Sequence, residues 1–60
     1  MPRFPKHHEL LPRLRRIEGQ IRGIGRMVEE RRYCIEIVQQ LTAARRALDQ
    51  VTLKIMNGHI

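Results

Sequence analysis

Several residue types are missing or rare in this sequence, and each gap excludes a class of protein. There is no serine, and the six acidic side chains show no paired spacing of the kind that acid–base catalysis needs, so we expect no enzyme. One Phe and one Tyr are too few for a surface that stacks unpaired bases. No apolar run approaches the roughly 20 residues that span a bilayer, so we expect no membrane protein.

The single cysteine, Cys34, excludes an intrachain disulfide and suits a reducing compartment, where a free thiol persists. The opening residues MPRFPKHHE contain no apolar segment of a signal peptide, so we expect a cytoplasmic protein. The 60 residues allow a single domain, 1–60, in which residues 1–9 form a tail because Pro2 and Pro5 disfavour a helix. A core this small is marginal by itself, and oligomerisation is a common remedy.

Positive charge, by contrast, is abundant. The sequence has 12 Lys and Arg residues against 6 Asp and Glu, for a net charge of +6. Most of these cations are arginines, whose planar guanidinium group suits bidentate contact with phosphate. A basic chain of this size favours an anionic partner, and double-stranded DNA is the first candidate.

The first of two segments with helical periodicity begins at Leu10, with Pro12 in its first turn, where a missing N–H is harmless. Its apolar positions alternate spacings of four and three: Leu10, Leu14, Ile17, Ile21, Ile24 and Val28. Arginines are expected on the opposite surface: Arg13, Arg15, Arg16, Arg22 and Arg26. Gly19 and Gly23 weaken this helix, which indicates either close approach by another backbone or a tolerated weak spot.

A second helix is expected to run to the end of the chain, after a connection at residues 29–32. Its apolar positions form two rows with a seven-residue repeat: Cys34, Leu41, Leu48 and Ile55, and Ile37, Ala44 and Val51. The shorter first helix cannot cover this long seam, so a second chain must do so. We therefore predict an all-α fold, a helical hairpin that dimerises into an antiparallel four-helix bundle, or a dimer of such dimers.

Cys34 and His59 lie near opposite ends of the second helix, 25 residues and roughly 37 Å apart. They cannot share a metal ion within one helix, but an antiparallel second copy would bring Cys34 of one chain level with His59 of the other. Thiolate and imidazole form a soft ligand set. The competing interpretation is a buried cysteine and a histidine that favours the helix dipole. His7 and His8 are either an additional metal site or a solvated pair.

Three stretches of the chain resemble the copper-sensitive operon repressor family, which includes nickel/cobalt-sensing and formaldehyde-sensing repressors. They are RLRRIEGQIRGIGRMVEE, RRYCIEIVQQLTAARRAL and NGHI, and the resemblance covers nearly the whole chain from Leu10. It implies an antiparallel four-helix dimer, often a dimer of dimers, whose metal-free form represses genes by binding operator DNA. It also implies that copper(I) binds between chains, through Cys34 of one and His59 of the other, and weakens DNA binding.

The inducer depends on a residue beyond this sequence, because the family's next ligand lies four positions after the histidine. The sequence stops at Ile60, so we expect a truncated chain. A cysteine at that position would favour copper(I), and a histidine would extend the choice to nickel, cobalt or zinc. A residue that binds no metal would favour the formaldehyde branch, which uses Pro2 and the cysteine. Tyr33 is similar to the copper branch, where this tyrosine supports the ligands without binding the metal.

For DNA binding, the resemblance points to Arg13 and Arg45, and the helical pattern adds Arg15, Arg16 and Arg22. The competing interpretation of each arginine is a solvated helix face. Two rival functions need no metal: a constitutive basic protein that coats nucleic acid, and a basic amphipathic helix that lies on an anionic membrane. Metal binding therefore separates the sensor from both rivals.

Overall fold

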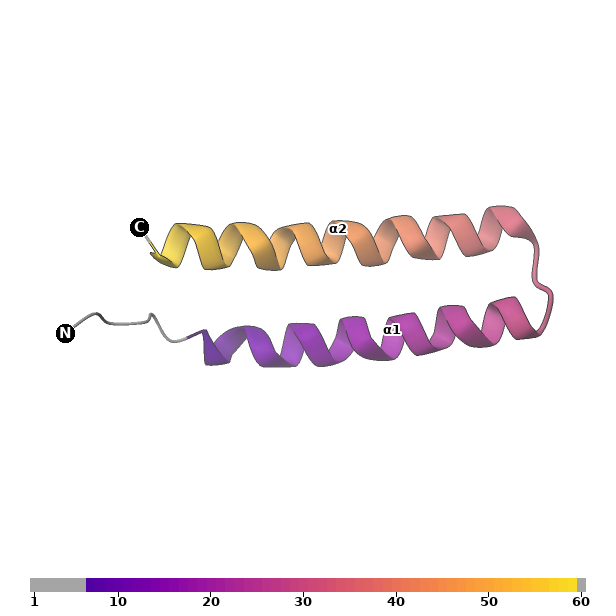
Figure 1. Ribbon diagram of the computed structural model, residues 1–60, viewed down its shortest axis with the longest axis horizontal. Coiled ribbons are helices and arrows are strands. Elements are labelled where there is room, and N and C mark those ends of the chain that lie inside the picture. Colours follow the sequence, from indigo (N-terminus) through magenta and orange to yellow (C-terminus); the bar gives the residue numbers. More distant parts are fainter. Residues whose placement is uncertain (1–6, 60) are drawn as a thin grey trace.

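The computed structural model describes residues 7–59, with side chains through residue 58, and consists of an antiparallel helical hairpin (Figure 1). A short 3-10 helix, η1, spans His8–Leu10 and leads into α1, Leu11–Glu29, and α2 spans Cys34–His59. The molecule is 52 Å long and 15 by 14 Å across. Neither helix in this part of the chain combines the length and apolar character that a membrane crossing requires. The prediction of two helices is confirmed.

The start of the hairpin differs slightly from the predicted tail of residues 1–9. Helical structure already begins at His8, because the backbone N–H of Leu10 donates a hydrogen bond to the carbonyl of His7, at 2.9 Å. Pro12 is the second residue of α1, where its missing N–H leaves no helical hydrogen bond unmade. His8 and Glu9 therefore belong to the helical part of the chain and not to its tail.

A Schellman motif ends α1 and turns the chain back on itself. The N–H of Arg31 donates to the carbonyl of Val28 at 3.1 Å, and the N–H of Arg32 donates to the carbonyl of Met27 at 3.0 Å. Arg31 has a φ of 58°, in the left-handed region that this motif requires and that glycine adopts most easily. A residue with a Cβ pays roughly 1–2 kcal/mol there. The predicted connection at residues 29–32 is thus confirmed, shifted by one residue.

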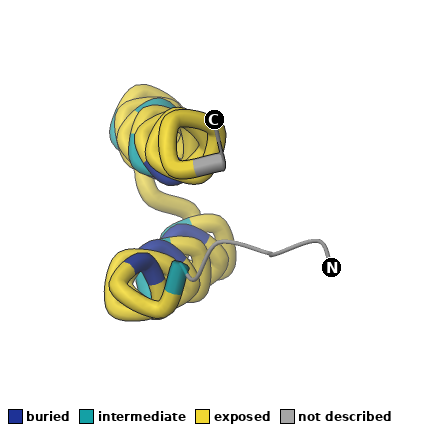
Figure 2. Tube along the Cα trace, turned by 90° about the vertical axis from the view of Figure 1, so that its left-hand side faces the viewer, coloured by how far each residue is buried: buried dark blue, intermediate teal, exposed yellow. Residues whose placement is uncertain are grey.

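The core lies along one row of side chains from each helix. Leu10, Ile17 and Ile24 face Ala44 and Val51, and all five are at most 6% exposed. An end-on view shows these buried positions on the facing sides of the two helices (Figure 2). The inner rows are therefore Leu10–Ile17–Ile24 from the first helical segment and Ala44–Val51 from α2, with Ile37 half-buried at the same spacing.

A second row on each helix stays exposed in the single chain. On α1 it comprises Leu14, Ile21 and Val28, and on α2 Leu41, Leu48 and Ile55. We call these six residues the outer rows. The apolar pattern predicted for each helix thus divides in two, because one hairpin contact can cover only one row per helix. The outer rows remain exposed, because a hairpin of only two helices cannot bury both apolar rows of each helix.

Candidate functional site

The hairpin has two different sides, and helical geometry assigns each residue to one of them. Arg13 and Gln20 flank the buried Ile17 four positions before and three after it, whereas Leu14 and Ile21 flank it on its other side. Arg13 and Gln20 line one groove together with residues of α2. The outer row of α1 therefore lies on the side away from that groove.

The same reasoning applies to α2. Ala47 and Gln50 line the groove, three and six positions after the buried Ala44. Leu41 and Leu48, three before and four after Ala44, fall on the opposite side. Both outer rows consequently lie on one side of the hairpin and form a single apolar face, and the groove lies on the other side.

Cys34 begins α2 and continues its outer row, seven positions before Leu41. It is exposed, so the competing interpretation of a buried core cysteine is wrong for the single chain. His59 ends α2, four positions after Ile55, and its side chain lies outside the described residues. The two predicted ligands thus lie at opposite ends of one apolar face. Among the side chains of residues 7–58, no three His, Cys, Asp or Glu residues come together to hold a metal ion.

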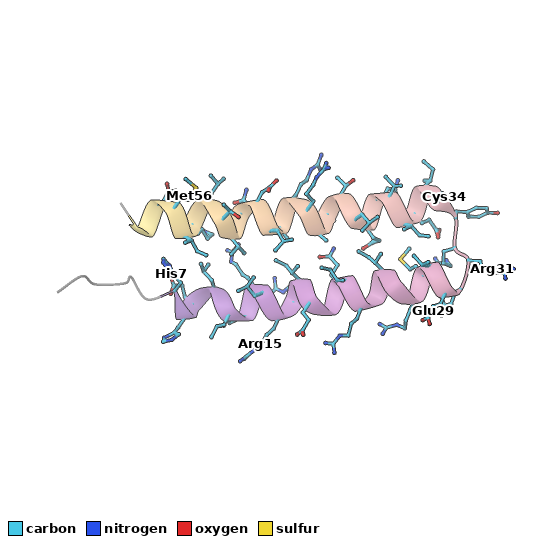
Figure 3. All side chains as sticks on the ribbon, viewed as in Figure 1. His7, Arg15, Glu29, Arg31, Cys34 and Met56 are labelled. Atoms are coloured by element: carbon cyan, nitrogen blue, oxygen red, sulfur yellow. The ribbon has the colours of Figure 1, made fainter. Side chains whose placement is uncertain are left out.

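Tyr33 precedes Cys34 at the bend and is 81% exposed, so the single chain leaves its ring free to contact another surface. It lines a shallow hollow with Arg31, Arg32 and Glu36. The Arg32 guanidinium pairs with the Glu36 carboxylate, Nη2 to Oε1 at 3.0 Å. Figure 3 shows Arg31 at the bend and Cys34 at the adjacent start of α2.

The two tail histidines separate in the structure. His7 is half-buried against the last turn of α2, where its Cε1 atom lies 3.3 Å from the position that a Cβ on Gly58 would occupy. His8 is exposed in η1. His7 therefore lies at the same end of the hairpin as His59. An additional metal site at His7 and His8 stays a prediction, and Pro2 lies outside the described residues.

The predicted DNA-binding arginines divide among three surfaces, although all of them are exposed. Arg13 and Arg16 line the groove beside Ile17, so the prediction that they lie opposite the apolar row is wrong. Arg15 points away from α2 (Figure 3), and Arg22 follows it by seven positions on the same surface of α1. Arg45 follows the buried Ala44 on α2, on the side of the apolar face.

The sequence reasoning missed Gln20 and Gln50. They share the groove with Arg13 and Arg16, although 30 positions separate them in the chain. A signal was available on α1 alone, because Gln20 follows Arg13 by seven positions and Arg16 by four, which places all three on one surface. Gln50 of α2 could be assigned to the groove only from the pairing of the two helices in the structure.

Comparison with known proteins shows the family of this chain. The family model described as metal-sensitive transcriptional repressor matches residues 6–60. The copper-sensing transcriptional repressor RicR of Mycobacterium tuberculosis is 50% identical over 48 residues, which are 80% of this chain and 50% of that protein. The copper-sensing transcriptional repressor CsoR of Bacillus subtilis is 45% identical over 51 residues, 85% of this chain and 50% of that protein.

A solved structure shares the fold of this chain. The crystal structure of the copper-sensing repressor CsoR with Cu(I) from Geobacillus thermodenitrificans superposes with a TM-score of 0.83 at 44% identity, covering 98% of this chain and 62% of that one. The chain spans about half the length of the curated relatives it matches. The family model covers almost every residue, and the chain therefore belongs to the metal-sensitive transcriptional repressor family.

Proposed function

We propose that this protein is a copper(I)-responsive transcriptional repressor. Its metal-free form binds double-stranded operator DNA in the cytoplasm, and copper(I) bound between two copies of the chain releases the DNA. The relatives named as copper-sensing repressors and the related structure with Cu(I) support this choice of metal. A soft thiolate also favours copper(I) over hard divalent ions.

One observation carries the proposal: Cys34 and His59 occupy the two ends of one uncovered apolar face. When two such faces pack with their α2 helices antiparallel, Cys34 of one chain lies level with His59 of the other, at both ends of the dimer. The apolar outer rows supply the free energy of association, and the ligands meet as a consequence. Tyr33 precedes Cys34 in the chain, and we assign it a supporting role beside the metal without direct binding.

The assembly also explains why a metal changes DNA binding. Coordination across two chains fixes the position of one α2 against the other, and the arginines are carried on these rigid helices. A coupling of about 1–3 kcal/mol between metal and DNA is the usual range for such linkage, so copper(I) should weaken DNA binding about 5- to 150-fold. Nickel, zinc or formaldehyde as the inducer is the alternative within the family, and titration with each inducer separates them.

A mixed dimer tests the shared site. We expect a Cys34→Ala chain paired with a His59→Ala chain to keep one intact ligand pair and to lose both ligands at the other end. The mixed dimer should bind one copper(I) with high affinity in competition with a chromogenic chelator, and each mutant homodimer should bind none. A mixed dimer without metal, or homodimers that bind as the wild type does, would refute the shared site.

The DNA half of the proposal is tested by Arg13→Ala and Arg45→Ala. Each arginine that contacts a phosphate releases counterions, so its loss should weaken duplex binding and reduce the slope of log affinity against log salt by about 0.9. Circular dichroism checks that both variants keep their helices. An affinity and a slope unchanged in both variants would show that these arginines form a solvated surface only.

A further inference from the structure

A groove runs along the hairpin on the side opposite the apolar face. It has a volume of about 120 Å³ and is lined by the following six residues: Arg13, Arg16, Ile17, Gln20, Ala47 and Gln50. One ordered water molecule needs only about 10–15 Å³ of such space, so the groove has room for a small anion such as phosphate. We call this hollow the basic groove.

The chemistry of the lining selects an anion. Ile17 and Ala47 form its apolar floor, and every polar side chain in it is a hydrogen-bond donor: two guanidinium groups and two carboxamides, with no carboxylate. The only salt bridge among the side chains of residues 7–58 joins Arg32 to Glu36 at the bend, so Arg13 and Arg16 keep their charge uncompensated by a carboxylate in contact.

The two glutamines are available to a ligand as well. Gln20 is half-buried and Gln50 is exposed at the rim. The side-chain hydrogen bonds within residues 7–58 are Arg32 to Glu36 and Thr52 to the carbonyl of Leu48, and neither involves a glutamine. Their amide N–H groups can therefore donate to an anion that the arginines attract. A guanidinium group and a phosphate form charge-assisted, often bidentate, hydrogen bonds.

We propose that the basic groove binds one phosphate of the DNA backbone. Arg13 and Arg16 supply the charge, while Gln20 from α1 and Gln50 from α2 each donate an N–H to a phosphate oxygen. This inference rests on the proposed function as a DNA-binding repressor and adds to it a defined phosphate site with two neutral ligands. Because its donors come from both helices, the site exists only when the hairpin is closed.

The two kinds of donor have different signatures in a salt titration. An arginine that neutralises a phosphate releases counterions, whereas a glutamine contributes a hydrogen bond without changing the charge of the protein. A hydrogen bond to a charged group corresponds to about tenfold in affinity. We therefore expect Gln20→Ala and Gln50→Ala each to weaken binding about tenfold at an unchanged salt slope. Arg16→Ala should weaken binding and also reduce the slope by about 0.9.

The experiment measures fluorescence anisotropy of a short labelled DNA duplex of mixed sequence, titrated with the metal-free protein at several salt concentrations. The matched control is Gln39→Ala, which removes the same side chain from an exposed position of α2 outside the groove. It lies 11 positions, or roughly 16 Å, from Gln50. We expect its affinity to equal that of the wild type.

Each outcome decides the question. A loss confined to Gln20→Ala and Gln50→Ala, at constant slope, supports the phosphate site. Wild-type affinity in both variants, or an equal loss in Gln39→Ala, overturns it, and normal effects of Arg13→Ala and Arg45→Ala would then leave the repressor function standing. A second arm follows the ³¹P line width of inorganic phosphate. If free phosphate binds and requires Gln20 while DNA affinity does not, the groove takes a free anion and the DNA assignment is wrong.

Discussion

Leu48→Ala is expected to weaken dimerisation of this protein by about 30-fold. Leu48 is 42% exposed in the single chain, although it lies in the middle of the apolar face. Complete burial of a leucine side chain stabilises by roughly 1.5–3 kcal/mol, so covering the remaining 42% contributes about 1 kcal/mol. A symmetric dimer buries two copies, which gives about 2 kcal/mol, or about 30-fold in the dissociation constant.

The assay is sedimentation equilibrium over a range of protein concentrations, with circular dichroism to confirm that α2 is retained. Alanine is the best helix former, so the substitution does not weaken the helix itself. The matched control is Leu53→Ala, because Leu53 has a similar exposure of 52% on the same helix. It lies five positions further, which is about 140° around the helix and away from the apolar face.

The comparison of the two leucines can refute the assembly. We expect Leu53→Ala to leave the monomer–dimer equilibrium within a factor of about 2, because its surroundings do not change in the dimer that we propose. If Leu53→Ala dissociates the dimer and Leu48→Ala does not, the outer rows are not the interface. The pairing of Cys34 with His59 would then lose its geometric basis.

Three further predictions concern the stability of the hairpin, each measured by urea denaturation. Arg31→Gly should raise the free energy of unfolding by about 1 kcal/mol, because glycine relieves the strain of a φ of 58°; no gain would contradict the Schellman cap. Gly58→Ala should stabilise α2 less in the wild type than in a His7→Ala background, because the new Cβ would lie 3.3 Å from the imidazole; an equal gain in both would mean that His7 does not pack there. Glu36→Gln should cost no more than about 0.5 kcal/mol, since its salt bridge with Arg32 is exposed; a loss above about 1 kcal/mol would show a larger network.

The sequence was sufficient to predict the helices and the separation of the two proposed ligands. The alternating four- and three-residue spacing of the apolar positions predicts α1 and its apolar side, and simple helix geometry places Cys34 and His59 at opposite ends of α2. It could not tell which row faces inward, because the inner and outer rows have the same seven-residue repeat and similar side chains. The left-handed residue of the turn is an arginine, which gives no sequence signal for such a conformation.

The basic groove was beyond sequence reasoning for a related reason. Arginines stand out in the sequence through their charge, and the family resemblance predicts Arg13 as a DNA contact. Gln50 is neutral and lies 30 positions from Gln20, so only the register between α1 and α2 brings the two amides into one hollow.

The role of Gly19 also needed the structure. A Cβ added at Gly19 would have no atom within 4 Å in the single chain. Within this hairpin, that favours the tolerated weak spot over close approach by another backbone.

If Cys34 and His59 bind the metal as we propose, their positions at the two ends of α2 tie the site to the length of this helix. An insertion of one residue between Cys34 and His59 would turn the histidine by about 100° relative to the cysteine and displace it by about 1.5 Å, in both copies at once. An insertion of seven residues would restore the orientation but lengthen each helix by about 10 Å. The bend at residues 30–33, by contrast, lies outside the stretch between Cys34 and His59. An insertion in the bend therefore leaves the spacing of Cys34 and His59 unchanged, whereas a single-residue insertion in α2 changes it.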